Sequence, residues 1–373
     1  MSYGEKQKPP VRVWCDGCFD LVHYGHANSL RQARQMGDVL VVGVHSDADI
    51  ESNKGPPVFT EGERYQMVRA IKWVDEVVEG STYWPTADTL RQFNCDCAAH
   101  GDDLSVTKDG QDPYLALKEA GLLRIYERTE GVSTTNIVSR MLRMTKDHHA
   151  DFLESGECPL QKCGLKRWGE VKAGWPKPIR ISAFNAAAQK IAQFSDGSQP
   201  KPGDRIVYVS GDFDLLHPGH LAFLKAARAE GDYLLVGIHS DQVVNEKKGG
   251  NFPIMNIYER SLSLLACRYV SEVILAAPYD VTQELMDDFK VDLVCHGFTE
   301  VLEVNAGVDP YAVPKRLDKF KRIISGNRLT TDGIVARIIS HRSSYLKRNE
   351  AKAEREDQAA SAPSTHRQEQ PVF

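Results

Sequence analysis

The chain has 373 residues, a length that suits two domains of ordinary size rather than one. Its 42% hydrophobic and 26% charged residues are typical of a globular protein, and its net charge of −5 argues against a general affinity for nucleic acid, which requires a basic face. No apolar run approaches the roughly 18 residues of a membrane span, and residues 1–10 lack the apolar stretch of a signal peptide. Eight widely spaced cysteines favour free thiols in a reducing compartment, so we predict a cytoplasmic protein.

The chain contains two copies of one sequence pattern. The segment FDLVHYGH at residues 19–26 recurs as FDLLHPGH at residues 213–220, and VGVHSD at residues 42–47 recurs as VGIHSD at residues 236–241. Both pairs are offset by 194 positions, and later matches are offset by 196 or 197, so only three residues of net insertion accumulate. A regularity of this extent indicates a tandem duplication.

Each copy begins with a β-rich run, at residues 11–14 and 206–209, followed by a glycine-containing turn and a helix-like segment. A continuous apolar run comes next, at residues 39–44 and 233–238, and residues 291–295 form a clear late strand. Strand, helix and doubly buried strand make a βαβ unit of a parallel sheet. We therefore predict the α/β fold class with two tandem Rossmann-like domains, which bind ligands at the carboxyl ends of their strands.

The composition also places the boundaries. We predict a first domain at residues 11–145, a linker at 146–203, a second domain at 204–342 and a polar tail at 343–373. Within the linker, the amphipathic stretch Ser182–Phe194 is predicted to be a helix. The tail is predicted to be a solvated, fraying helix that becomes disordered. Its scarcity of large apolar residues disfavours the alternative of a membrane anchor.

The first copy places a His-x-Gly-His motif, with His23 and His26, just after its first strand and at the start of a helix. A helix N-terminus offers unpaired N–H groups and the positive end of the helix dipole, and both attract phosphate. The intervening Gly25 permits close approach to the backbone, and imidazoles three residues apart lie near each other. Such a pair can stabilise negative charge on a leaving group, so the motif suits attack on the α-phosphorus of a nucleoside triphosphate with loss of pyrophosphate.

Three alternatives stand beside this interpretation. Cys15 and Cys18 have the spacing of a thioredoxin-like redox motif, and with the two histidines they look like a Cys2His2 zinc site. The second copy has Val209 and Asp212 at the corresponding positions but keeps both histidines, and zinc sites require longer spacings, so we disfavour redox and zinc chemistry. Two buried structural histidines are the third alternative.

Basic residues supply further candidates. Lys54 lies in a loop with Gly and Pro after the second strand, and Lys248 lies in the matching loop of the second copy. A solvated side chain is the alternative for a loop lysine, but its repetition beside the motif favours phosphate binding. The segment RTEGVSTT at residues 128–135 places Arg128 before a Ser/Thr-rich helix start, which forms a second anion cradle. Its alternative is an N-cap beside a surface arginine.

Together, the two motifs resemble the signatures of the cytidylyltransferase family, whose members serve phosphocholine, phosphoethanolamine and glycerol phosphate. The first motif is shared with other nucleotidylyltransferases and with class I aminoacyl-tRNA synthetases, whereas the pair of motifs is specific. The resemblance extends over residues 11–340 and implies two tandem nucleotidyltransferase domains. The duplication is similar to the branch that serves phosphoethanolamine. It therefore implies CTP and phosphoethanolamine as substrates in phosphatidylethanolamine synthesis, and Mg²⁺ that enters with CTP and has no assured protein ligands.

The resemblance implies a role for each matching residue of the first copy. His23 and His26 would stabilise the transition state on the triphosphate, and Lys54 and Arg128 would contact phosphates. Asp20 would lie near the metal-bound phosphates. The remaining contacts to CTP would come from two loops: Asp102, Asp103, Gly131, Ser133, Thr134 and Thr135.

The second copy keeps only part of this pattern. SGNR at residues 325–328 replaces the Arg-Thr-Glu-Gly stretch, and Phe298-Thr299 replaces the Asp pair. We infer that the second copy still binds a cytidine nucleotide and that the first copy performs the chemistry, which the second supports or adjusts by sensing nucleotide. The residues expected to contact that nucleotide are Phe213, His217, Pro218, Gly219, His220, Lys248, His296, Gly297, Phe298, Thr299, Arg328, Leu329, Thr330 and Thr331.

The sequence leaves several alternatives for acceptor and assembly. Phosphocholine or glycerol phosphate are alternative acceptors, since an aromatic cage would favour a quaternary ammonium and carboxylates a primary amine. A CTP-binding regulator without turnover is the rival from another functional class. Residues 73–77 match residues 269–273, and in the family the like segment lies at the dimer contact. This resemblance implies an internal pseudo-dimer. A homodimer and a peripheral membrane association are compatible with it.

Overall fold

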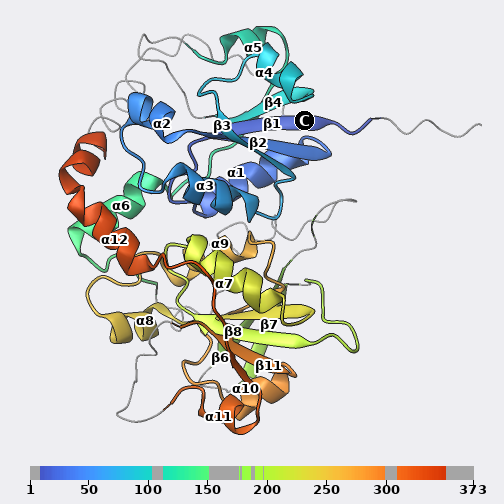
Figure 1. Ribbon diagram of the computed structural model, residues 1–373, viewed down its shortest axis with the longest axis vertical. Helices are drawn as coiled ribbons and strands as arrows, with labels where there is room; N and C mark the ends of the chain where they lie inside the picture. The colour runs from blue at the N-terminus through green and yellow to red at the C-terminus, as the bar shows by residue number, and fades with distance from the viewer. Residues whose placement is uncertain are drawn as a thin grey trace, which may run out of the picture.

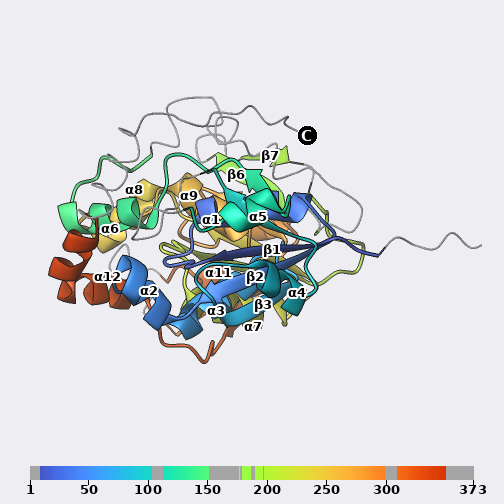
Figure 2. The ribbon, with the colours of Figure 1, turned by 90° about the horizontal axis from the view of Figure 1, so that it is seen from above.

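The computed structural model describes residues 9–102, 112–150, 179–185, 190–195, 197–298 and 309–349, together with Pro176. The chain forms two α/β units that stack one above the other, as Figure 1 shows from the side and Figure 2 from above. We call them copy one and copy two, after the two repeats of the sequence. Helices from both units lie between the two sheets (Figure 1).

Copy one is built on a parallel sheet of five strands in the order β3-β2-β1-β4-β5. The chain leaves β1 toward one edge and returns to β4 on the other side, so the loops after these strands form a crevice at the carboxyl ends. The elements are β1 (Arg12–Gly17), α1 (Tyr24–Gln35), β2 (Val39–His45), α2 (Asp47–Lys54), α3 (Glu61–Arg69), β3 (Glu76–Ser81), α4 (Ala87–Gln92), β4 (Cys97–Gly101), α5 (Leu115–Glu119), β5 (Leu123–Tyr126) and α6 (Thr134–Arg143).

Copy two repeats this order and extends one edge, as β12-β11-β8-β9-β10-β6-β7. The parallel α/β prediction is therefore confirmed in both copies. The elements are β6 (Arg180–Asn185), β7 (Lys190–Ser195), β8 (Ile206–Gly211), α7 (Pro218–Arg228), β9 (Tyr233–Ile238), α8 (Asp241–Lys248), α9 (Ile257–Leu265), β10 (Glu272–Leu275), α10 (Gln283–Asp288), β11 (Leu293–His296), α11 (Ala312–Arg316), β12 (Phe320–Arg322) and α12 (Thr331–Ser340).

The helix predicted for Ser182–Phe194 is wrong, because β6 and β7 pair there as antiparallel strands. Strand β6 also pairs in parallel with β10, so this part of the linker adds two strands to the sheet of copy two. The hydroxyl of Ser182 donates a hydrogen bond to a Glu272 carboxylate oxygen at 2.5 Å. The open edge of β10 supplies main-chain partners that outweigh the local preference for helix.

The described part of the predicted tail is a helix, as the sequence predicts, but one of its residues is buried rather than solvated. Residues 342–349 continue as a helix after α12, and Tyr345 on this helix is only 2% exposed. The rest of the predicted tail lies outside the described residues. Over the described ranges, no helix is both long enough and apolar enough to cross a membrane.

The two copies contact each other through α1 and α3 on one side and α9 and α7 on the other, and they share one hydrophobic core. At the centre of the contact, Ile71 and Cys267 form an isolated antiparallel bridge. Two equivalent backbone hydrogen bonds flank it, from Lys72 N to Ala266 O (2.8 Å) and from Arg268 N to Ala70 O (2.9 Å). Equivalent contacts in pairs are what an internal two-fold arrangement produces.

Side chains follow the same pseudo-symmetry. Arg140 on α6 forms a bidentate ion pair with Glu259 on α9, at 2.6 and 2.9 Å. Arg337 on α12 pairs in the same way with Glu63 on α3, at 2.7 and 3.1 Å. Trp73, in the segment expected at the contact, is 2% exposed. The two copies therefore pack as the internal pseudo-dimer that the sequence predicts, whereas a homodimer of whole chains stays a prediction.

Candidate active site

The loop after the first strand has the same unusual backbone in both copies. Phe19 and Leu21 have φ values of 50° and 47°, and their counterparts Phe213 and Leu215 have 49° and 50°. Residues other than glycine seldom adopt left-handed φ values, and such residues cluster at functional sites because the surrounding structure must hold them. Here the loop ends by presenting the first histidine of the motif to the start of a helix.

In copy one, His23 is the N-cap of α1, and its Nδ1 accepts a hydrogen bond from Gly25 N at 3.1 Å. The backbone N–H of His23 points to Nδ1 of His26 at 3.4 Å. The two imidazole rings stack with their centroids 4.0 Å apart. Both rings thus lie at the helix N-terminus, as the spacing predicts.

Copy two builds the same stacked pair, with His217 as the N-cap of α7 and the rings of His217 and His220 3.7 Å apart. Burial lowers the pKa of His217 to about 2 and that of His220 to about 4, so both rings are neutral near pH 7. Nε2 of His217 and Nδ1 of His220 are buried, and neither has a hydrogen-bond partner among the described residues. A buried polar atom of this kind indicates a site that a ligand or water completes.

The start of α6 lies against the histidine loop. Ser133 is the N-cap of α6 and accepts from Asn136 N at 3.1 Å, and the hydroxyl of Thr134 donates to Asp20 O at 2.8 Å. A Cβ on Gly25 would lie 2.9 Å from a Val132 methyl, so only glycine fits there. Two helix N-termini therefore meet at one place, which concentrates N–H groups and positive dipole ends for a polyphosphate.

Copy two has the same junction in modified form. The hydroxyl of Thr331 donates to Asp214 O at 3.0 Å, and Thr330 caps α12. A Cβ on Gly219 would lie 2.2 Å from Leu329 O, so the backbones touch more closely here than in copy one. Arg328 is exposed beside this junction.

A polar cavity opens beside the start of α6. One Asp102 carboxylate oxygen accepts from Arg128 N at 2.9 Å and so orients the loop that begins RTEG. Five of the residues predicted for copy one border this cavity, whereas five others do not, namely Asp20, His23, His26, Lys54 and Thr134. Its lining consists of Asp102, Glu127, Arg128, Thr129, Glu130, Gly131, Val132, Ser133, Thr135, Asn136 and Asn349.

The lysines of the two copies differ in their surroundings. Lys54 is the last residue of α2, is exposed, and lies with its ammonium 6.0 Å from the centroid of the Tyr83 ring. Lys248 is the last residue of α8, but its ammonium pairs with the Asp212 carboxylate at 2.5 Å. Burial raises the pKa of Asp212, but the charge of Lys248 outweighs this effect and holds that pKa below its usual range. Copy two therefore already has an anion beside its lysine.

Asp20 contacts backbone groups. Its carboxylate accepts from Val58 N at 3.0 Å and Phe59 N at 2.9 Å, and so holds the loop that follows Lys54. Its counterpart Asp214 accepts from Ile254 N and Met255 N in the same way. This geometry assigns Asp20 a loop-holding role in addition to any contact near the phosphates.

Sequence reasoning missed a fully buried arginine in each copy. Arg64 donates to Cys18 O and His45 O, both at 2.7 Å, and Arg260 donates to the equivalent carbonyls of copy two. These arginines tie the loop after the first strand to the loop after the second. Their repetition at an offset of 196 is visible in the sequence and was a signal of this role.

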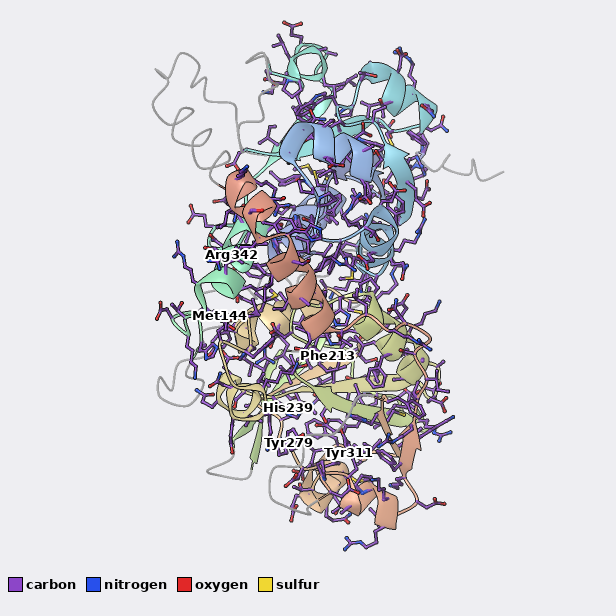
Figure 3. The ribbon with its side chains drawn as sticks, turned by 60° about the vertical axis from the view of Figure 1, so that its left-hand side comes forward. Met144, Phe213, His239, Tyr279, Tyr311 and Arg342 are labelled. Carbon is purple, nitrogen blue, oxygen red and sulfur yellow. The ribbon has the colours of Figure 1, made fainter. Side chains whose placement is uncertain are left out.

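Sequence reasoning also missed a buried acid. Asp16 is the last residue but one of β1 in copy one, and its carboxylate lies 3.6 Å from Nε2 of His45. Burial raises the pKa of Asp16 to about 7. The ring of His45 lies 4.8 Å from that of Tyr83, and His239 and Tyr279 repeat this contact in copy two at 5.3 Å (Figure 3). Copy two has Ser210 at the position of Asp16, so only copy one carries an acid there.

Three predicted residues of copy two lie at the end of β11 and directly after it, namely His296, Gly297 and Phe298. Nδ1 of His296 contacts Gly297 O at 2.8 Å, and Phe298 is 61% exposed. Asp103 and Thr299 lie outside the described residues. At the first strand, burial raises the pKa of the Cys15 thiol to about 12, which opposes the thiolate that redox or metal chemistry would use.

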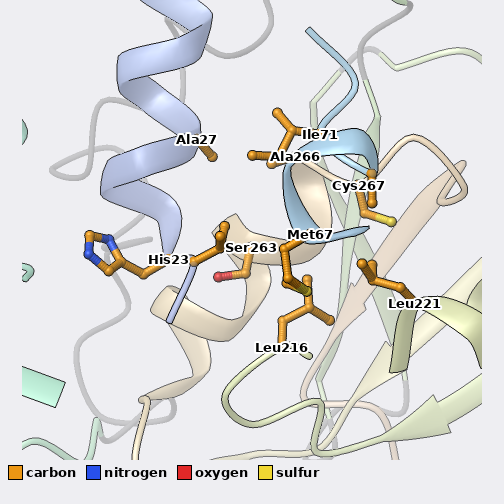
Figure 4. A pocket seen from close by; sticks show the side chains of 11 residues that line it. His23, Ala27, Met67, Ile71, Leu216, Leu221, Ser263, Ala266 and Cys267 are labelled. Atoms are coloured by element: carbon orange, nitrogen blue, oxygen red, sulfur yellow. The ribbon is translucent and has the colours of Figure 1, made fainter. Parts of the chain in front are cut away.

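A second cavity, of about 20 Å³, lies between the copies (Figure 4). Met67 and Ile71 line it from copy one, and Leu216 and Leu221 from copy two. Figure 4 shows the imidazole of His23 pointing away from this apolar lining. A space that holds about one water is a packing gap, so the polar cavity beside α6 is the candidate nucleotide site.

The comparisons with known proteins agree with this geometry. The family described as cytidylyltransferase-like matches residues 14–140 and again residues 208–332. The chain belongs to the cytidylyltransferase-like family. Both matches of this family include the histidine motif and reach the start of α6 or α12.

Relatives within the cytidylyltransferase-like family resemble the chain over different lengths. The chain is 51% identical to the ethanolamine-phosphate cytidylyltransferase of Mus musculus, over 97% of this chain and 93% of that protein. It is 50% identical to the enzyme of that name from Dictyostelium discoideum, over 94% and 96%. It is 41% identical to human choline-phosphate cytidylyltransferase A, but over only 38% of this chain and 39% of that protein. The duplicated architecture is thus shared with the first two relatives.

Proposed function

We propose that the chain transfers the cytidylyl group from CTP to phosphoethanolamine and releases CDP-ethanolamine and pyrophosphate. The observation that carries this proposal is the meeting of the stacked histidine pair with the start of α6 in copy one, beside a polar cavity lined by Arg128 and Asp102. The two full-length relatives support the choice of phosphoethanolamine, since both carry the name of that activity.

The chain's own residues suit each part of this reaction. A phosphate oxygen of the acceptor attacks the α-phosphorus of CTP, and the bond from that phosphorus to the bridging oxygen breaks. Pyrophosphate leaves with the electron pair of that bond. His23 and His26, at the N-terminus of α1, would donate hydrogen bonds to phosphoryl oxygens as this charge develops, and Arg128 would hold phosphate oxygens at the cavity.

Lys54 and Asp16 suit the two ends of phosphoethanolamine. Lys54 would attract the acceptor's phosphate, and it acts electrostatically on Asp16, whose pKa burial raises and Lys54 lowers. A buried carboxylate is a suitable acceptor for a primary ammonium group, which donates hydrogen bonds. The absence of this acid from copy two supports placing the reaction in copy one.

A divalent cation, which the reaction class implies, would enter with the triphosphate and shield its charge. Throughout the described ranges, no group of three His, Cys, Asp or Glu side chains is arranged to hold a metal ion. Asp20, the acid nearest the motif, accepts two backbone hydrogen bonds. The protein residues therefore fit a cation that phosphate oxygens and water hold, as Mg²⁺ prefers. A cytoplasmic location stays our prediction.

The test is pyrophosphate release from CTP and Mg²⁺ with phosphoethanolamine, phosphocholine or glycerol 3-phosphate offered separately. We expect release with phosphoethanolamine at a kcat/KM at least tenfold above the other two, and CDP-ethanolamine as the product. The variant Asp16→Asn should lower kcat/KM for phosphoethanolamine about tenfold while it leaves the KM for CTP unchanged, since it removes one charge-assisted contact. Preference for another acceptor would contradict the substrate. Tight CTP binding by folded protein without release would favour a regulator.

A further inference from the structure

The segment that follows the last helix of copy two lies on copy one. Figures 1 and 2 both show α12 beside α6 of copy one, and Arg342, labelled in Figure 3, is the first residue of the helix that follows α12. The helix of residues 342–349 therefore begins at the junction between the copies. It then runs along the loop that follows Lys54.

Three consecutive carbonyls of that loop accept hydrogen bonds from this end of copy two. Arg348 donates to Pro56 O at 2.9 Å, Tyr345 donates to Pro57 O at 3.2 Å, and Arg337 donates to Val58 O at 2.8 Å. We call residues 55–59 the lysine loop of copy one. From its other side, Asp20 accepts the N–H groups of Val58 and Phe59.

Arg348 connects the two sides of the lysine loop. Besides Pro56 O, its guanidinium reaches a carboxylate oxygen of Asp20 at 3.4 Å. Its stem packs near Gly55, where an added Cβ would lie 3.6 Å from the Arg348 Cγ, and its head lies 5.0 Å from the ring centroid of Tyr345. Gly55 has a φ of +91°, a conformation that glycine adopts readily and that would otherwise leave this point flexible. Lys54 directly precedes it.

Copy one makes equivalent contacts on copy two. His148 contacts Pro253 O at 2.7 Å, and Arg140 donates to Ile254 O at 3.3 Å. These two carbonyls correspond to Pro57 and Val58, and His148 corresponds to Tyr345. The lysine loop of copy one and the matching loop of copy two are thus each held by the last helix of the other copy and by the segment that follows that helix. Because equivalent contacts occur in both copies, the arrangement is a feature of the repeated fold and not of one loop.

The same helix also reaches the nucleotide cavity. Asn349 lines the cavity beside α6 together with Arg128 and Asp102. Its Oδ1 is buried and has no hydrogen-bond partner among the described residues. The end of copy two therefore borders the cavity on one side and holds the lysine loop on the other.

We propose that Arg348 is a positioning residue for the reaction of copy one, and that it acts by holding the lysine loop so that Lys54 meets the phosphates. This inference rests on the proposed function. Removal of the guanidinium would free Pro56 and the turn at Gly55, and Lys54 would sample positions away from the phosphate. A displacement of about 1 Å near reacting groups can cost on the order of 100-fold in rate.

The test is a double-mutant cycle with steady-state kinetics and urea unfolding on the full chain. We expect Arg348→Ala to lower kcat/KM for phosphoethanolamine about 10- to 100-fold, and Arg348→Lys to stay within about fivefold of wild type, because an ammonium can still donate to Pro56 O. Arg342→Ala, on the exposed part of the same helix, is the matched control and should change kcat/KM less than twofold. If Arg348 acts through Lys54, the loss should disappear in a Lys54→Ala background.

Arg348→Met keeps the packing of the aliphatic part of the side chain on Gly55 and Tyr345. It takes the place of Arg348→Ala if the alanine variant unfolds at a lower urea concentration than the wild type. An equal loss in the wild-type and Lys54→Ala backgrounds would overturn the proposal, and so would a loss that merely follows the folded fraction. If the wild-type protein turns over and Arg348→Met has the same kcat/KM, this inference is contradicted but the proposed function is not. Absence of wild-type turnover would contradict the proposed function instead.

Discussion

Copy one and copy two have the same strand order and the same stacked histidine pair, but they differ in the charges around those histidines. Copy one has Asp16 at the end of β1 and an exposed Lys54, whereas copy two has Ser210 and a lysine paired with Asp212 at 2.5 Å. Copy one also has Asp102 to orient the RTEG loop, and copy two has the exposed Phe298 there. The shared fold builds a stacked histidine pair at a helix start, and a few substitutions set the charges around that pair.

The contacts between the copies also give copy two a structural role that does not depend on turnover. Arg337, Tyr345 and Arg348 come from the end of copy two and hold a loop of copy one. Copy one therefore depends on copy two for the position of its lysine loop. Supporting the site requires the fold of copy two and its final helix, but it does not require the chemistry of copy two.

The largest difference between the copies should appear when one histidine of each is removed. His26→Ala should lower kcat about 10³-fold, because it removes a donor to the charge that develops on the triphosphate. The matched variant His220→Ala should lower kcat less than about threefold if copy two does not turn over. Steady-state pyrophosphate release measures both. Retained turnover in the first variant, with loss in the second while CTP still binds copy one, would reverse the assignment.

Removal of the lysine of each copy should also affect kcat/KM differently, but the difference should be smaller than for the histidines. Lys54→Ala should lower kcat/KM about 100-fold, because it removes a positive charge that would contact phosphate as negative charge develops. Lys248→Ala should change it less than about threefold, since Asp212 already neutralises that ammonium. Asp212→Ser in copy two should release Lys248 and tighten CTP binding there, measured by calorimetry on a His26→Ala background. Unchanged affinity would show that the Asp212 pair does not compete with phosphate.

The ion pairs between the copies should affect stability and activity differently. Arg140→Met should lower the free energy of unfolding by about 2 kcal/mol, because its partner Glu259 is only 8% exposed and would lose its counter-charge. Arg337→Met should cost about 1 kcal/mol, as its pair is more exposed, but it should also lower kcat/KM because it frees Val58 O. Urea unfolding and steady-state kinetics measure these changes.

Arg69→Met is the control for these pairs, since Arg69 and Glu79 are both about half exposed and the pair should contribute little. Equal effects of Arg140→Met and Arg337→Met on kcat/KM would contradict the assignment of the lysine loop of copy one to the active site.

The sequence predicts the features that local chemistry determines. The paired histidines at a helix start, the strands at residues 39–44 and 233–238, and a helix that starts in the Ser/Thr-rich segment after Arg128 all follow from residue type and spacing, and the structure confirms them. The duplication made these predictions stronger, because each feature appears twice.

Features that depend on distant partners could not be predicted in this way. Ser182–Phe194 contains alanine and glutamine, which favour helix, but the exposed edge of β10 provides a strand partner. Tyr345 and Arg348 lie in a polar stretch, and nothing local shows that they reach a loop nearly 300 residues earlier. The ion pair of Lys248 with Asp212 could be predicted only in part. Comparison of the repeats shows that copy two has an acid, Asp212, where copy one has Cys18, but it does not show that this acid pairs with Lys248.

The smallest expected effect is on the pH dependence of stability, and here the two copies should behave alike. Burial lowers the pKa of His45 in copy one and of His239 in copy two to about 4 in each case. The unfolded chain takes up a proton near the ordinary value of about 6.5, so each buried imidazole makes stability fall as the pH drops from about 6.5 toward 4. Between pH 7.5 and 5 this loss should be on the order of 1–2 kcal/mol per histidine.

His45→Asn and His239→Asn should each remove that share of the pH dependence in urea unfolding, whereas His341→Asn, which changes an exposed ring, should not. Asp16 lies 3.6 Å from the His45 ring, but burial raises the pKa of Asp16 to about 7, so at pH 5 this acid is protonated and cannot stabilise an imidazolium. A smaller effect of His45→Asn than of His239→Asn would therefore mean that Asp16 stays ionised in the folded protein. In that case copy one would hold a permanent negative charge at the end of β1, and its ammonium-binding role would no longer depend on pH near neutrality.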